Sequence, residues 1–88
     1  MEIKVIALTT TQQVLISQIE EIPAAVPGEP DCKLTNPFKL NKQSNDEYTL
    51  ETWIDFTNQN EIMIHSDSIL TLVDPTSDLL KKYIDLIK

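Results

Sequence analysis

The chain has 88 residues, of which 14 are acidic and 7 are basic, so its formal net charge at pH 7 is −7. This length holds one domain with a small core, and the negative charge repels phosphate polyanions, which disfavours a basic nucleic-acid groove. The single cysteine excludes an internal disulfide, and no apolar run approaches the roughly 18 residues that a membrane span needs. Because residues 1–4 also lack the features of a signal peptide, we expect one soluble, cytoplasmic domain over residues 1–88, without a membrane partner.

Two β-strands are predicted in the first 22 residues. Apolar side chains occupy both faces of an extended segment over residues 3–8, which is typical of a strand that is covered on both sides or packed at an interface. The polar residues 9–13 then predict a hairpin turn. In the next strand, Val14 to Ile22, neither face is uniformly apolar, and a β-bulge or a strong bend would resolve this conflict.

A loop and a third strand follow. Residues 23–30 contain three prolines and the only glycine, and proline removes donors from a β-ladder. The third strand carries Cys32 and Leu34 on one face, is interrupted at Asn36-Pro37 and resumes before a polar hairpin loop over residues 41–46. Cys32 is interpreted as a small core hydrophobe, because no second cysteine or ligand histidine completes a zinc site.

The predicted sheet is organised around residues 48–73. A long strand over residues 48–57 is followed by a tight turn at 58–60 and a strand that pairs back as a hairpin, before a kink at 66–68 and a short last strand. Trp53 lies on the opposite face of the long strand, where it either joins a covered core or anchors a partner. The face of the long strand expected to be buried carries Tyr48, Leu50, Thr52, Ile54 and Phe56.

A C-terminal helix is predicted over residues 74–88. Asp74 is expected to cap its first amides, with Pro75 at the first helical position. Asp78 near the start and lysines later in the segment complement the helix dipole. One apolar stripe packs on the sheet or docks another protein, and it consists of Leu79, Leu80, Tyr83, Ile84 and Ile87.

Two segments resemble the motifs of Sm and Sm-like domains. Residues 31–37, DCKLTNP, are similar to the first Sm motif, and residues 64–69, IHSDSI, are similar to the second. The short acidic form with an Asp-Pro-Thr helix start looks most like the Sm-like proteins of marine cyanophages. The resemblance implies a mostly β fold, with a strongly bent five-stranded antiparallel open barrel over residues 1–73 and a helix over residues 74–88. It also implies the host-cell cytoplasm as the location if the protein is encoded by a phage.

The resemblance further implies a closed ring, in which the fourth strand of one subunit pairs with the fifth strand of the next. The residues fit this expectation, because no lysine or arginine lies between Lys42 and Lys81 to guard these strands against edge pairing. A heterologous contact that closes on itself gives a cyclic oligomer. We therefore expect a homo-oligomeric ring of five to seven subunits, with an interface formed by Glu61, Ile62, Met63, Ile64, Ile69, Leu70, Thr71 and Leu72.

In RNA-binding Sm proteins the two motif loops line the pore, where one loop stacks and bonds a base and the other grips it with an arginine. The resemblance places Glu29, Pro30, Asp31, His65 and Ser66 at these positions. Without an aromatic and without the arginine, the RNA-binding motifs are weakened. Two hypotheses follow. The chain is either a ring-forming module that binds RNA or acts in RNA metabolism, or an adaptor ring that binds a protein, through the helix or Trp53, and no RNA.

Catalytic and metal-binding patterns are weak. His65-Ser66-Asp67 contains the letters of a hydrolytic triad, but neighbours on a strand point to opposite faces. The carboxylates of Glu51, Asp55 and Glu61 are interpreted as a solvated face rather than a divalent-ion site. Gly28 is alone, so no phosphate-binding loop is predicted. We expect no enzymatic activity, no metal and no cofactor.

Overall fold

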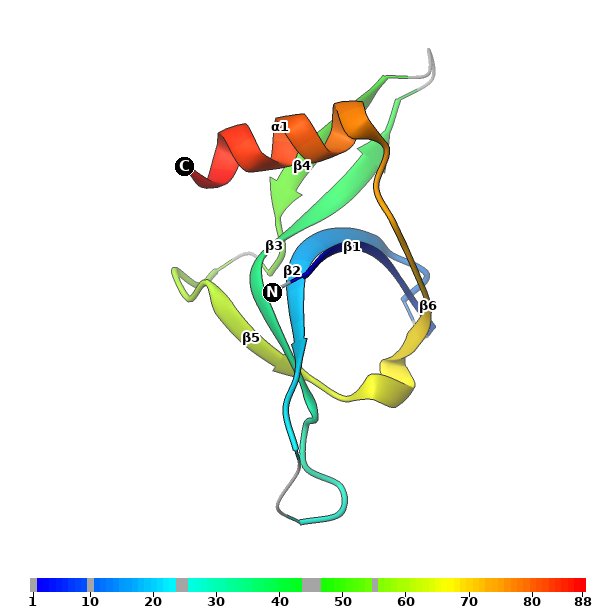
Figure 1. Cartoon of the computed structure of the whole chain (residues 1–88), viewed down its shortest axis with the longest axis vertical. Coiled ribbons are helices and arrows are strands. Elements are labelled where there is room, and N and C mark those ends of the chain that lie inside the picture. The colour runs from blue at the N-terminus through cyan, green and yellow to red at the C-terminus, as the bar shows by residue number, and fades with distance from the viewer. Residues whose placement is uncertain (1, 10, 24–25, 44–46, 55) are drawn as a thin grey trace.

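The computed structural model describes residues 2–9, 11–23, 26–43, 47–54 and 56–88. These residues form six β-strands, a short 3-10 helix and a C-terminal α-helix that lies over one end of the sheet (Figure 1). The predicted mostly β fold with a C-terminal helix is confirmed. In chain order the elements are β1 (Glu2–Leu8), β2 (Val14–Glu21), β3 (Cys32–Lys42), β4 (Tyr48–Thr52), β5 (Glu61–Ile64), η1 (Ser66–Ser68), β6 (Ile69–Val73) and α1 (Ser77–Ile87).

The strands form one antiparallel sheet with the order β4-β3-β2-β1-β6, and β5 pairs with β3 beside this path. Within the described residues the sheet is not closed into a barrel. Figure 1 shows β5 and β6 on opposite sides of the sheet, running in opposite directions. The predicted kink before the last strand is η1.

The long strand predicted after Tyr48 is interrupted. β4 pairs with residues 38–42 of β3, and β5 pairs with residues 32–35 of the same strand. The predicted hairpin between residues 48–57 and the strand that begins at Glu61 is therefore wrong, because both segments are neighbours of β3 rather than of each other. Six strands are present, as the residue pattern predicts, whereas the Sm resemblance implies five.

A bulge in β3 lies at the point of interruption. Between Ile16 and Gln18 of β2 the register with β3 shifts, so that β3 carries an extra residue at Asn36-Pro37. Asn36 has a φ of 54°, a left-handed conformation that asparagine tolerates better than most residues. Pro37 has no N–H to give to a neighbouring strand. For the second strand the sequence predicts a β-bulge or a strong bend. The structure has a bulge in the pairing of β2 with β3, but the extra residue lies on β3.

The segment between β4 and β5 leaves the sheet at this bulge. We call the described residues of this segment, 53–54 and 56–60, the 53–60 loop. The expected burial of Ile54 and Phe56 is wrong, because their exposed fractions are 44% and 106%. Alternation predicts a buried face only while a segment stays in the sheet, and β4 ends at Thr52.

Both faces of the sheet are covered. α1 packs on one face, where Leu79 and Tyr83 are buried against Ile16. Val5 of β1 contacts this cluster, whereas Ile6 belongs to the cluster on the other face, so the predicted two-sided covering of the first strand is confirmed. The buried residues of that other cluster are Ile6, Leu8, Leu15, Ile19 and Leu34.

α1 begins three residues later than predicted. Thr76 is the N-cap, and its Oγ1 accepts a hydrogen bond from the Leu79 amide at 3.3 Å. The predicted cap by Asp74 is wrong, because this carboxylate instead forms an ion pair with Lys4. Asp78 lies in the first turn of α1, as predicted, and of the predicted lysines only Lys88, the C-cap residue, lies at the C-terminal end of the helix. Lys82 lies 4.3 Å from the centre of the Tyr48 ring, a cation–π contact.

Candidate functional site

The two loops that the Sm resemblance assigns to a pore meet in the structure. The Asp31 carboxylate accepts hydrogen bonds from the amide and the hydroxyl of Ser66, both at 2.7 Å. Nε2 of His65 lies 2.8 Å from the carbonyl oxygen of Gly28. Because a carbonyl can only accept, the imidazole donates from this nitrogen. We call this set of contacts between residues 28–31 and residues 65–66 the loop junction.

The predicted pore residues are not all part of this junction. Asp31, His65 and Ser66 take part in its contacts. Glu29 instead lies on an exposed turn, where its amide donates to the carbonyl oxygen of Val26 at 3.2 Å. Pro30 is half-buried next to Asp31.

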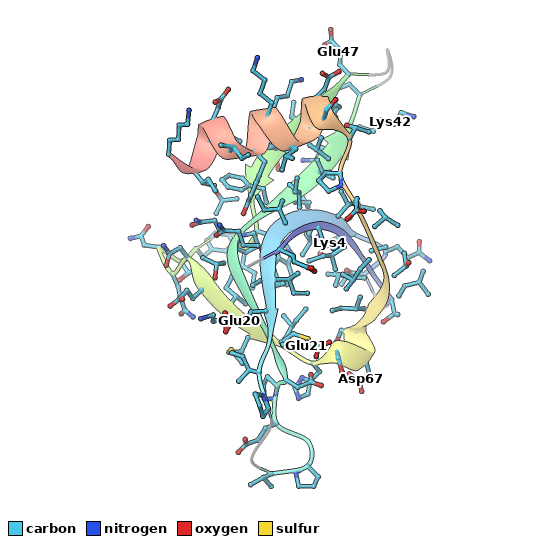
Figure 2. The ribbon with its side chains drawn as sticks, in the orientation of Figure 1. Lys4, Glu20, Glu21, Lys42, Glu47 and Asp67 are labelled. Atoms are coloured by element: carbon cyan, nitrogen blue, oxygen red, sulfur yellow. The ribbon has the colours of Figure 1, made fainter. Side chains whose placement is uncertain are left out.

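The electrostatics of the loop junction favour a fixed negative charge. The Ser66 hydroxyl, and then its backbone amide, hold the pKa of Asp31 below its ordinary value of 3.8. Glu20, Glu21 and Asp67 lie in the same half of the molecule (Figure 2). The donors of Ser66 and His65 are already bonded within the subunit, so an anionic ligand meets mainly acidic groups here.

Several lysines form ion pairs with carboxylates in the described part of the chain. These pairs are Lys4–Asp74, Lys33–Glu61 at 3.4 Å, Lys39–Glu51 at 3.8 Å and Lys88–Asp85 at 3.7 Å. Exposed pairs contribute little to stability, but they cancel charge that a nucleic acid would need.

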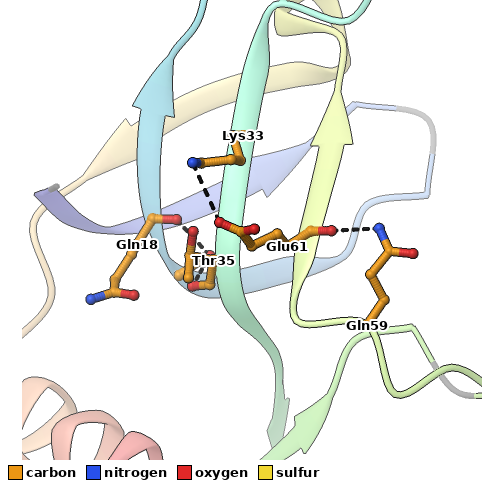
Figure 3. Close-up of polar contacts among 6 residues, drawn as sticks. Gln18, Lys33, Thr35, Gln59 and Glu61 are labelled. Carbon is orange, nitrogen blue, oxygen red and sulfur yellow. Dashed lines mark hydrogen bonds and ion pairs between the residues drawn. The ribbon is translucent and has the colours of Figure 1, made fainter.

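The outer edge of β5 is one of two candidate assembly edges. On its inner side β5 pairs with β3, and no described strand lies on its outer side. Glu61, the acidic residue of β5, is neutralised by Lys33, while its backbone carbonyl accepts from the Gln59 side chain (Figure 3). Ile62 is buried and the side chain of Met63 is 43% exposed. Apart from this carbonyl, which the Gln59 side chain occupies, the outer edge of β5 has no strand partner within the described residues, and it carries little net charge.

The outer edge of β6 is the second candidate. β6 pairs only with β1 among the described strands. Leu70, Leu72 and Val73 are 70%, 44% and 49% exposed. Such an apolar, unguarded edge is a template for pairing with another strand. Leu70 and Leu72 are among the predicted interface residues, and Val73 extends the same exposed apolar edge beyond them.

Other residues singled out from the sequence have structural positions. Cys32 is 4% exposed, and burial raises the pKa of its thiol, which confirms its interpretation as a core residue. Trp53 packs against the core cluster on the face of the sheet opposite α1 and donates from Nε1 to Oε1 of Gln13 at 3.1 Å, which favours the covered-core alternative. Asp55 lies outside the described residues. The described part of the chain contains no group of three or more His, Cys, Asp or Glu side chains placed to hold a metal ion.

The described helices include none with the length and apolar character that crossing a membrane requires. The consecutive residues His65 and Ser66 bond to separate partners, so they do not form the hydrogen-bonded chain of a hydrolytic triad. Two structural roles were not predicted from the sequence: the hydroxyl of Tyr83 bonds to the backbone at the bulge of β3, and Thr76 caps α1. The Asn36-Pro37 pair was the available signal for the bulge, and the threonine three residues before Leu79 was the signal for the cap.

Comparison with known families gives one match. The model described as "Family of unknown function (DUF6561)" matches residues 1–88. No curated protein matches the chain. The match therefore supplies a family without an activity, and any function has to be argued from the edges and the loop junction.

Proposed function

Since the chain belongs to the DUF6561 family, a family of unknown function, we propose on structural grounds that it is a noncatalytic Sm-like module that assembles into a homomeric ring. The observation that carries this proposal is the pair of unpaired edges, β5 and β6, on opposite sides of one sheet. In the ring, the outer edge of β5 in one copy pairs with the outer edge of β6 in the next. Because the two edges differ, the contact is heterologous and closes by rotation.

The strand count supports the Sm-like reading. β4 and β5 pair with successive parts of β3, so together they correspond to one interrupted fourth strand. β6 then becomes the fifth strand. The two free edges therefore belong to the two strands between which the Sm resemblance implies the subunit contact, and the sheet corresponds to the bent open barrel of that family.

The edges also have suitable chemistry for pairing. Each backbone hydrogen bond formed across the new seam contributes about 0.5 to 1.5 kcal/mol. Covering Leu70 and Leu72 adds hydrophobic stabilisation of roughly 25 cal/mol for each Å² of apolar surface removed from water. β5 and β6 contain no lysine or arginine, so the seam buries no basic side chain of either strand. We expect a ring of five to seven subunits.

A charge placed on the β6 edge tests the ring. Leu70 is 70% exposed, so Leu70→Lys leaves the subunit fold intact but puts a charge into the proposed seam. Val26→Lys, at another exposed apolar position, is the matched control. Light scattering at micromolar concentration is expected to show an oligomer for the wild type and Val26→Lys, and a monomer for Leu70→Lys. A wild type that is monomeric at these concentrations contradicts the proposal.

RNA binding by the ring is the second candidate. It is favoured by the meeting of the two motif loops at the loop junction, where His65 and Asp31 lie together. The charge of −7 per subunit and the paired lysines favour instead a ring that binds no RNA. Filter binding of short U-rich and A-rich RNA at low and moderate salt separates the two. Retention at moderate salt supports pore recognition, and no retention at low salt supports the RNA-free ring.

In that RNA-free version the ring is a structural or adaptor protein. Its protein-binding surface is then the exposed part of α1, where Ile84 and Leu86 are 36% and 51% exposed. Trp53 is a weaker candidate for this role, because its side chain is held against the core.

A further inference from the structure

The 53–60 loop presents apolar side chains on a fixed base. At one end the Trp53 amide donates to the Pro37 carbonyl oxygen at 3.1 Å, and at the other end the Asn36 amide donates to the Asn60 carbonyl oxygen at 2.7 Å. Both ends are thus held at the same bulge of β3. Between them Phe56 stands fully exposed. A loop with such a base holds its tip in place at little further cost in conformational entropy.

The backbone of Phe56 adds a second observation. Its φ is 75°, a region in which a bulky side chain is a genuine outlier. Strained residues of this kind persist where surrounding structure holds them, and they cluster at functional sites. Within the described part of the subunit, an entirely exposed phenylalanine gains no burial in return for this strain. The tip is therefore built to contact something outside the subunit.

The position of the loop identifies the partner as a second copy. The loop leads directly into β5, on the same side of β3, so whatever covers the β5 edge also meets the loop. β5 and β6 run in opposite directions at opposite sides of the sheet (Figure 1), so a neighbour that shares the orientation of this copy adds its β6 antiparallel to β5. In an antiparallel pair, the residues before Glu61 run beside the residues after β6 of the neighbour.

The neighbour offers a suitable surface at that place. Val73 is 49% exposed and Pro75 is half-buried, so both present apolar atoms. The carboxylate between them, that of Asp74, is paired with Lys4 and does not have to be desolvated alone. We propose that Phe56 packs against residues 73–75 of the adjacent copy, and that the 53–60 loop clamps the seam formed by β5 and β6. This inference rests on the proposed ring.

Photo-crosslinking tests the contact directly. Phe56 is replaced by p-benzoyl-L-phenylalanine in the full chain, and the crosslinked peptides are identified by mass spectrometry. We expect dimeric products in which position 56 is joined to a peptide containing residues 73–75. Crosslinks that form only within one chain, or that reach a different part of the neighbour, overturn the proposal.

Substitution tests its contribution to assembly. Phe56→Ser is expected to raise the dissociation constant between subunits about tenfold or more, because a phenylalanine side chain loses its burial at the seam. Phe56→Gly is expected to weaken assembly equally while it does not lower the urea midpoint of the monomeric subunit, because glycine adopts positive φ without strain. Val26→Ser is the matched control and is expected to change neither quantity.

The outcomes separate this inference from the ring itself. A wild type that is monomeric removes both. A wild-type ring whose assembly is unchanged by Phe56→Ser removes only the clamp and leaves the β5–β6 seam standing.

Discussion

The hydroxyl of Tyr83 donates to the carbonyl oxygen of Asn36 at 2.8 Å, and so connects α1 to the bulge of β3. The same hydroxyl accepts from the Gln18 amide at 3.2 Å. Burial raises the pKa of Tyr83, which keeps the phenol protonated and able to donate. The backbone groups that the bulge removes from the β-ladder are therefore satisfied by a side chain of the helix, and this contact fixes α1 on the sheet.

Tyr83→Phe is expected to lower the free energy of unfolding by about 1 to 3 kcal/mol, because it leaves buried backbone groups at the bulge without partners. The ring packing is retained, since Phe38 contacts the edge of the Tyr83 ring at 5.9 Å between centroids. Urea denaturation of the monomeric Leu70→Lys background measures the change without a contribution from assembly.

Tyr48→Phe is the matched control for this prediction. The hydroxyl of Tyr48 is buried and has no hydrogen-bond partner among the described residues. Its removal is expected to be neutral or slightly stabilising. Equal losses for the two variants would contradict a specific role of the Tyr83 hydroxyl.

Asn36→Ala tests the left-handed conformation at the bulge. We expect a loss of about 1 to 2 kcal/mol, because alanine at positive φ brings its Cβ too close to the backbone. Asn36→Gly is expected to be neutral or mildly stabilising, since glycine adopts this conformation readily. Asn41→Ala, elsewhere in β3, serves as the control. If alanine and glycine at position 36 have the same effect in urea denaturation, the backbone explanation is wrong.

The loop junction is expected to make stability depend on pH. The pKa of Asp31 is lowered in the folded state, so its contribution is complete above the ordinary pKa of 3.8 and is lost as the pH falls through the lowered value. Asp31→Asn should therefore destabilise the subunit at pH 6, and this difference from the wild type should shrink as the pH falls below 3.8. Urea denaturation of both proteins at several pH values measures it.

Asp67→Asn is the control for the pH prediction, because it removes a carboxylate from the same turn and leaves the bonds between Asp31 and Ser66 in place. A destabilisation by Asp31→Asn that stays constant across this pH range would show that the carboxylate does not act through its charge.

The sequence predicts Asp74 as the N-cap of α1, whereas the structure places Thr76 there, and two substitutions distinguish these roles. Thr76→Ala is expected to cost about 1 kcal/mol, because it removes the acceptor for the Leu79 amide. Asp74→Ala removes a surface ion pair with Lys4 and should cost less than Thr76→Ala, with sensitivity to salt. Thermal and urea denaturation at two salt concentrations compare them. A larger, salt-independent loss for Asp74→Ala would restore it as the cap.

Periodicity was a good guide wherever the backbone stays in a regular element. The two-sided covering of β1, the burial of Cys32 and Leu34, and the packing of Leu79, Tyr83 and Ile87 of α1 follow from alternation or helical spacing. Ile84, predicted in the same stripe, is exposed. The conflict of faces in β2 also predicted a bulge or a strong bend. These features are set by the order of residues within one strand or helix, and this order can be read directly from the sequence.

Contacts between distant segments were harder to predict. Alternation continues through Ile54 and Phe56, but the chain has already left the sheet there because of a bulge on β3, a different strand. The Sm resemblance predicted that residues 31 and 65–66 come together. It did not predict that Asp31 and Ser66 satisfy each other, because hydrogen bonds between loops are decided by three-dimensional placement rather than by spacing.

The central claim is a closed ring joined through β5 and β6, and native mass spectrometry of the wild-type protein tests it most directly. The account predicts one dominant assembly of five to seven subunits, which is replaced by the monomer in Leu70→Lys. A monomeric wild type, or an open series of masses that increases with concentration and never closes, would contradict it.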